Sequence, residues 1–224
     1  MIFKKNLPPL AHFRRFVAAK ESWDVVWKQL EFRPKTTHPT LRKQSIDAAL
    51  EAAVASSYSL LAVEYFDIIA AKDKRLVDIA GEEPILLECL AFASSVVCNG
   101  VNPESDEYEL LLDSRQSIVP SFNQMSLLNT DEIENAILSR FDLYDKASSA
   151  TDREAYLSSS NARVLTYIAG GEHFSRIKIR YEDSPDLAYC MASQEFVSHV
   201  DVKLKEMFSR IVKREMDEEY DFET

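Results

Sequence analysis

Hydrophobic residues recur at helical spacing along most of the chain, and the longest such segment is residues 42–72. This segment contains no Gly or Pro and is rich in alanine, which favours helix. With residues about 100° apart, Leu61, Tyr65 and Ile68 fall on one stripe, and alanines fill most of the other faces. Because a helix that is apolar nearly all round is usually buried, we expect residues 42–72 to form a central core helix.

The same spacing, with proline near helix starts and glycine after helix ends, predicts further helices. They cover residues 10–32 with a break near Ser22, a short turn at 76–79, 84–98, an acidic helix from 103 that Pro120 ends, 131–144, 152–169 and 185–216. Residues 174–181 fit both a strand and a helix, and we favour helix because a lone strand would have no partner. The sequence therefore predicts an irregular bundle of about seven to nine helices.

Glycine scarcity supports an all-α fold. The chain has only four glycines, and all of them fall between the predicted helices. A sheet protein of this length would need many tight turns, in which glycine most readily supplies positive φ angles. We expect one helical domain over residues 1–224, in which 46% hydrophobic residues suffice for a full-sized core.

Charge is distributed unevenly along the chain. Residues 1–43 hold ten basic and three acidic residues, a balance of +7, and residues 44–224 hold sixteen and thirty-four, a balance of −18. The chain ends in an acidic tail, 217–224, which we expect to be frayed. An acidic body disfavours nucleic-acid binding, because phosphate contacts supply most of that affinity, so only segment 1–43 offers a surface for it.

The three cysteines form no CxxC pair, and we expect free thiols in a reducing compartment. Residues 6–16 are too polar and proline-rich for the core of a signal peptide. No apolar run approaches the length of about 18 residues expected of a membrane span. These features predict a cytoplasmic protein.

Three carboxylates are candidate metal ligands. Glu64 lies within the apolar stripe of the central helix with Asp67 beside it, and Glu88 lies in the apolar segment 84–98. A carboxylate in such a place needs a cation, a hydrogen-bond donor, a metal or a proton. If the two helices are adjacent, Glu64, Asp67 and Glu88 could bind Mg²⁺ or Mn²⁺, as in helical hydrolases.

Separate ion pairs are the favoured alternative for these carboxylates. Each carboxylate would then pair with its own arginine, for which Arg115, Arg140 and Arg163 are candidates, or extend to solvent at the rim of the bundle. The chain has no Glu-x-x-His pair of the di-iron bundles and no P-loop, GxGxxG, GxSxG or HExxH motif. His199 follows Glu195 by four residues, which predicts a side-chain pair on one helix rather than a ligand set.

Two classes of function remain. The first, which we favour, is a non-enzymatic interaction protein without a cofactor, such as an adaptor, an inhibitor or an immunity-type factor. Its acidic surface would engage a basic protein partner, since electrostatic attraction selects partners by charge and speeds association. The second is a metal-dependent helical hydrolase that uses Glu64, Asp67 and Glu88.

Thermal melting separates these two classes. A metal site predicts that Mg²⁺ or Mn²⁺ raises the melting temperature, because a ligand that binds only the folded state stabilises it, and that Glu64→Gln abolishes the rise. An ion-paired Glu64 predicts no response to metal. In that case Glu64→Gln itself costs several kcal/mol because its cation loses its partner.

Overall fold

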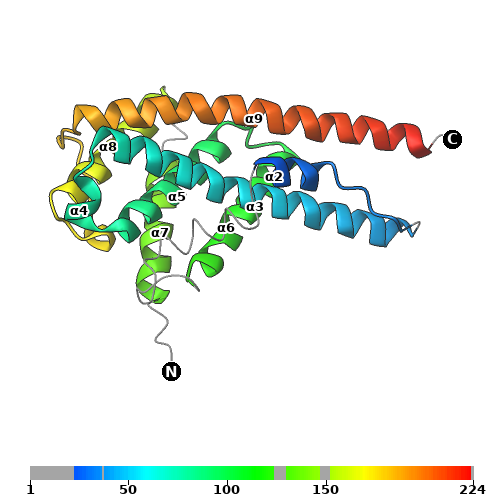
Figure 1. Ribbon diagram of the computed structural model, residues 1–224, viewed down its shortest axis with the longest axis horizontal. Helices are drawn as coiled ribbons and strands as arrows, with labels where there is room; N and C mark the ends of the chain where they lie inside the picture. The colour runs from blue at the N-terminus through cyan, green and yellow to red at the C-terminus, as the bar shows by residue number, and fades with distance from the viewer. Residues whose placement is uncertain (1–22, 37, 124–129, 147–151, 223–224) are drawn as a thin grey trace.

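The computed structural model describes residues 23–36, 38–123, 130–146 and 152–222. In these ranges the chain forms eight α-helices, one short 3-10 helix and no strand (Figure 1). The helices are α2 (Trp23–Leu30), α3 (Pro39–Lys72), α4 (Leu76–Ala80), α5 (Glu82–Asn99), α6 (Asp106–Asn123), α7 (Thr130–Asp145), α8 (Arg153–Ala169) and α9 (Leu187–Phe222). The predicted all-α bundle around a long central helix is confirmed.

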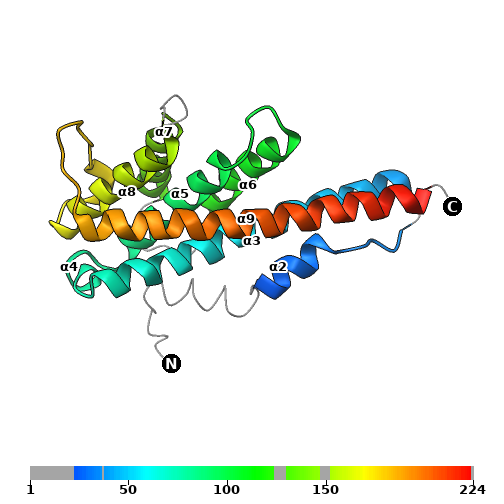
Figure 2. The same ribbon diagram turned by 90° about the horizontal axis from the view of Figure 1, so that it is seen from above.

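The two longest helices, α3 and α9, pack against each other, and α2 packs against both. Figures 1 and 2 show one end of each long helix projecting beyond the rest of the bundle on the same side. Arg210 of α9 binds Glu31, which follows α2, with Nη1 2.6 Å from Oε1. The Arg210 guanidinium also lies 4.7 Å from the ring centre of Trp27, so α2 is fixed by both charge and aromatic contact.

The predicted helix after the break near Ser22 is confirmed as α2, in which Val26, Trp27 and Leu30 are buried. The rest of that prediction, residues 10–22, lies outside the described residues. So does most of the basic segment 1–43 on which a nucleic-acid surface was considered.

The most enclosed helix is α5 rather than α3. Every residue from Ile85 to Cys98 is buried, and α5 packs against α3, α4, α6, α7, α8 and α9. In α3 burial begins at Ala53 and ends at Ile69, and the first four turns, which hold no buried residue, project beyond the rest of the bundle. Ile68, which the helical wheel placed on the buried stripe, is half-buried, while the neighbouring Ile69 is 1% exposed.

By length and composition alone, α3 is apolar enough to cross a membrane, so the expectation that no apolar run approaches that length was wrong for this helix. Half of its most apolar 18-residue window is buried inside the bundle. The core helix of a bundle meets the same criterion, so composition is weak evidence for a span.

Two predicted helix ends were wrong. Pro120 does not end α6, which continues for three more residues to Asn123. Proline removes one backbone hydrogen bond, and a helix that ends within its next turn loses little more. The last helix does not end at residue 216, because α9 runs to Phe222 without a Gly or Pro to stop it.

The predicted helix over residues 174–181 was also wrong. Only Phe174–Arg176 form a single 3-10 turn, and the chain then runs irregularly to α9. Arg140 of α7 donates to the carbonyls of Phe174 and Ile177, at 2.6 and 3.5 Å. An α-helix would pair the same two carbonyls with backbone N–H groups four residues later, so a tertiary contact replaces the helical bonds.

Leu61→Ala should lower the free energy of unfolding by about 2–5 kcal/mol, the range for truncating a buried leucine and leaving a cavity. The side chain of Leu61 is 2% exposed in the core. Leu41→Ala on the same helix should change stability by less than about 0.5 kcal/mol, because Leu41 is 52% exposed. Equal losses for the two variants in urea denaturation would contradict this placement of α3.

Candidate functional site

Glu64 and Glu88 contact different partners in the structure. Glu64 Oε1 accepts a hydrogen bond from Trp23 Nε1 at 2.8 Å, and its Oε2 lies 2.8 Å from His199 Nε2. Glu64 thus joins α2 and α9 to α3, and its partner is a histidine rather than an arginine. The predicted pairing of His199 with Glu195 was wrong, because Glu195 instead binds Lys72 at 3.1 Å.

The third candidate ligand, Asp67, is exposed on α3. Within the described ranges, no group of three or more His, Cys, Asp and Glu side chains is placed to hold a metal ion. The structure therefore does not assemble Glu64, Asp67 and Glu88 into one site.

Glu88 lies at the centre of the bundle and pairs with Arg140, as the ion-pair alternative predicted. Its Oε2 lies 3.2 Å from Arg140 Nε, and the two side chains are 0% and 4% exposed. Its Oε1 accepts hydrogen bonds from the Tyr144 hydroxyl and, at 3.0 Å, from Asn161 Nδ2. Burial raises the pKa of the Glu88 carboxyl, whereas these three partners act to lower it.

The contacts of Asn161 extend this cluster to two more helices. Its Oδ1 accepts hydrogen bonds from the Tyr65 hydroxyl and, at 2.7 Å, from Ser193 Oγ. We call Tyr65, Glu88, Arg140, Tyr144, Asn161 and Ser193 the Glu88 network. It links α3, α5, α7, α8 and α9, so one polar cluster holds five helices in register.

The Glu88 network has the character of a structural element. Burial raises the pKa of the Tyr65 and Tyr144 hydroxyls well above the usual tyrosine value, so both stay protonated near neutral pH and can donate the hydrogen bonds described above. Sequence reasoning identified Glu88 and Arg140 but missed the hydroxyls and Asn161. One signal was available: Asn161 lies four residues after Leu157 and four before Leu165, on the apolar stripe of the 152–169 helix.

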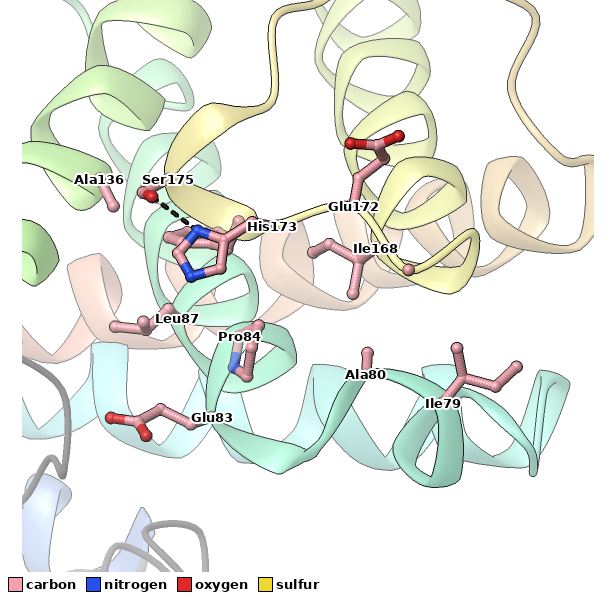
Figure 3. A pocket seen from close by; sticks show the side chains of 12 residues that line it. Ile79, Ala80, Glu83, Pro84, Leu87, Ala136, Ile168, Glu172, His173 and Ser175 are labelled. Atoms are coloured by element: carbon pink, nitrogen blue, oxygen red, sulfur yellow. Dashed lines mark hydrogen bonds between the residues drawn. The ribbon is translucent and has the colours of Figure 1, made fainter.

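An apolar pocket of about 210 Å³ lies where the start of α5 meets α4, the end of α8 and the 3-10 turn (Figure 3). We call it the apolar pocket, and its lining residues are Ile79, Ala80, Glu83, Pro84, Leu87, Ala136, Ile168, Gly171, Glu172, His173, Phe174 and Ser175. Figure 3 shows the His173 ring over the pocket and the carboxylates of Glu83 and Glu172 turned away from its centre at opposite borders. The pocket is therefore apolar inside and acidic at its edge.

His173 and Ser175 form a hydrogen bond at this pocket, with His173 Nδ1 2.7 Å from Ser175 Oγ. That distance suits a nucleophile and its base. However, the two side chains lie two residues apart in one turn, and in the described part of the chain no carboxylate binds the other ring nitrogen of His173. The hydrogen bond thus joins two residues of the same turn.

No sequence signal pointed to this pocket. Its lining comes from four separate helices and the Gly171–Ser175 turn, and no motif spans such a set.

Arg140→Met should lower the free energy of unfolding by about 3–5 kcal/mol, because Glu88 then remains buried without its cation. The double variant with Glu88→Gln leaves no unpaired charge, and it should be more stable than Arg140→Met alone by about 1 kcal/mol or more. Urea denaturation of the single and double variants measures this difference. A double variant that loses the sum of the two single effects would show that Glu88 and Arg140 are not coupled.

Comparison of the chain with known protein families, with curated proteins and with solved structures gave no match in any of the three.

Proposed function

We propose that this is a non-enzymatic cytoplasmic interaction protein that binds a basic protein partner, with the apolar pocket as the centre of the contact. An adaptor, an inhibitor and an immunity-type factor all fit this description. The observation that carries the proposal is an apolar pocket bordered by Glu83 and Glu172.

The size of the pocket supports recognition of one apolar side chain. About 210 Å³ of space lies against Leu87, Ile168 and Phe174, which offer apolar contacts. Protein interfaces gain most of their affinity from a few anchors that fill such pockets and are closed off from water by the surrounding rim. The exposed Ile79 at the border, 51% accessible, adds apolar surface beside the opening.

The carboxylates at the border support a partner with cations next to its anchor. Glu83 and Glu172 lie on opposite sides of the opening, so a segment crossing the pocket would pass near both. Asp78, exposed on α4, adds a third negative charge to this end of the molecule. Lysine or arginine on each side of an apolar anchor is the sequence pattern that this arrangement favours.

The net negative charge of the whole chain also favours a basic partner. The chain carries a net charge of −11, and α6 with the residues before it exposes four carboxylates, from Glu104, Glu107, Glu109 and Asp113. A field of one sign raises the encounter rate with an oppositely charged partner, and salt reduces the effect.

The alternative function, a hydrolase dependent on Mg²⁺ or Mn²⁺, gains no support from the carboxylates on which it relied. The oxygens of Glu64 and Glu88 are engaged by Trp23, His199, Arg140, Tyr144 and Asn161. The free thiols of Cys89, Cys98 and Cys190 are consistent with the reducing compartment that we propose.

A phage-displayed library of random peptides, selected on the purified protein, tests this proposal. Enriched peptides should share one large apolar residue with Lys or Arg within a few positions of it. Ala80→Leu fills the pocket, and Glu83→Lys with Glu172→Lys reverses its border, so each change should weaken an enriched peptide by about tenfold or more.

Matched controls come from the exposed start of α3. Ala48→Leu adds the same volume away from the pocket, and Asp47→Lys with Glu51→Lys makes the same change of net charge. Both controls should leave peptide affinity near that of the unaltered protein. Enriched peptides without cations, or equal losses in the test and control variants, would contradict the proposal.

A further inference from the structure

A second pocket, of about 350 Å³, lies between α7 and residues 175–179, on the other side of the segment that borders the apolar pocket. We call it the basic pocket, and it is lined by Ser139, Arg140, Leu143, Lys146, Ser175, Arg176, Ile177, Lys178 and Ile179. Four of these side chains are cationic and none is acidic, in a chain whose net charge is −11. Such a reversal of local charge marks a place that attracts anions.

Arg140 supplies a fixed, buried guanidinium to this pocket. The residue is 3% exposed, and the contacts with Glu88 and with the carbonyls of Phe174 and Ile177 hold it in place. A guanidinium has five N–H donors, and these contacts do not use all of them. Because Glu88 balances its charge, Arg140 contributes donors and position more than net charge.

The net positive charge comes from Lys146, Arg176 and Lys178. Arg176 and Lys178 are exposed, and neither has a carboxylate partner among the described residues. The carboxylates of α7 nearest in sequence to Arg140 and Lys146 do not line the pocket, and one of them, Asp145, is bound by Arg115. An anion beside Arg176 and Lys178 would therefore meet two cations that no described carboxylate already pairs.

The remaining lining sets the chemistry of the ligand. Ser139 Oγ already donates to the Ala136 carbonyl at 2.7 Å, so recognition of the anion falls to the cations. Leu143, Ile177 and Ile179 give the pocket an apolar wall. A pocket of this size is at the lower end of the range for small-molecule sites, about 300–1,000 Å³.

We propose that the basic pocket binds a phosphate monoester that carries an apolar or aromatic group. The phosphate oxygens contact Arg140, Arg176, Lys178 and Lys146, and the organic group lies against Leu143, Ile177 and Ile179. Arginine and lysine together suit a phosphate dianion, arginine through paired N–H donors and lysine as a point charge. This site is separate from the apolar pocket and does not depend on the proposed protein partner.

Calorimetric titration of the full chain with phenyl phosphate and with inorganic phosphate tests the proposal. Both should bind, phenyl phosphate more tightly because of the apolar wall, and added NaCl should weaken both. Amide resonances of Ser139, Lys146 and residues 175–179 should shift in proton–nitrogen NMR spectra. No binding of either compound, or shifts confined to other residues, would overturn the proposal.

Charge reversal gives a second test. Arg176→Glu with Lys178→Glu should weaken phenyl phosphate by about tenfold or more, since charge-assisted hydrogen bonds are lost and repulsion replaces them. The control, Lys43→Glu with Lys74→Glu, makes the same change of net charge at exposed positions outside the pocket and should keep binding. Equal weakening by both double variants would mean that only the overall charge matters, which contradicts a defined site.

Two further ligands distinguish the source of the phosphate. Tighter binding of adenosine monophosphate than of phenyl phosphate would support the site and assign it to a small metabolite. Tighter binding of a phosphotyrosine peptide would support the site and assign it to a modified protein. If phenyl phosphate binds no more tightly than inorganic phosphate, the apolar part of the proposal is wrong.

Discussion

The buried ion pair between Glu88 and Arg140 is the interaction on which most of this structure depends. A carboxylate at the centre of a helical bundle is costly unless it is paired, and here a hydroxyl and an amide donate to Oε1 while the Arg140 guanidinium lies 3.2 Å from Oε2. Because these partners come from α7 and α8, and Asn161 reaches onward to Tyr65 and Ser193, the geometry of one side chain constrains five helices. Apolar packing is less directional and does not fix their relative positions in this way.

The same ion pair shapes the surface. Arg140 reaches from Glu88 to the carbonyls of Phe174 and Ile177, and it thereby holds the segment after α8 away from helical geometry. That segment separates the apolar pocket from the basic pocket, and Ser175 lines both. A core contact and two candidate binding surfaces are thus linked through a single guanidinium.

Charge is segregated more finely in the structure than along the sequence. The start of α6 and the border of the apolar pocket present carboxylates, whereas Arg176, Lys178 and Lys146, which follows α7, present cations. A surface divided in this way suits two ligands of opposite sign. This is the physical basis for proposing a basic partner at one pocket and a phosphate monoester at the other.

The sequence alone determined the fold class and most of the helices, because helical periodicity is a local property of the chain, and it favoured an arginine partner for Glu88, because a buried charge is costly unless it is paired. Tertiary structure decided what local patterns do not encode. In the folded chain α5 rather than α3 is the most enclosed helix, and His199 contacts Glu64 rather than Glu195. At residues 174–181, contacts with Arg140 take the place of the expected helix. Both pockets are of this second kind, since their lining residues lie far apart in the chain and meet only when the helices pack.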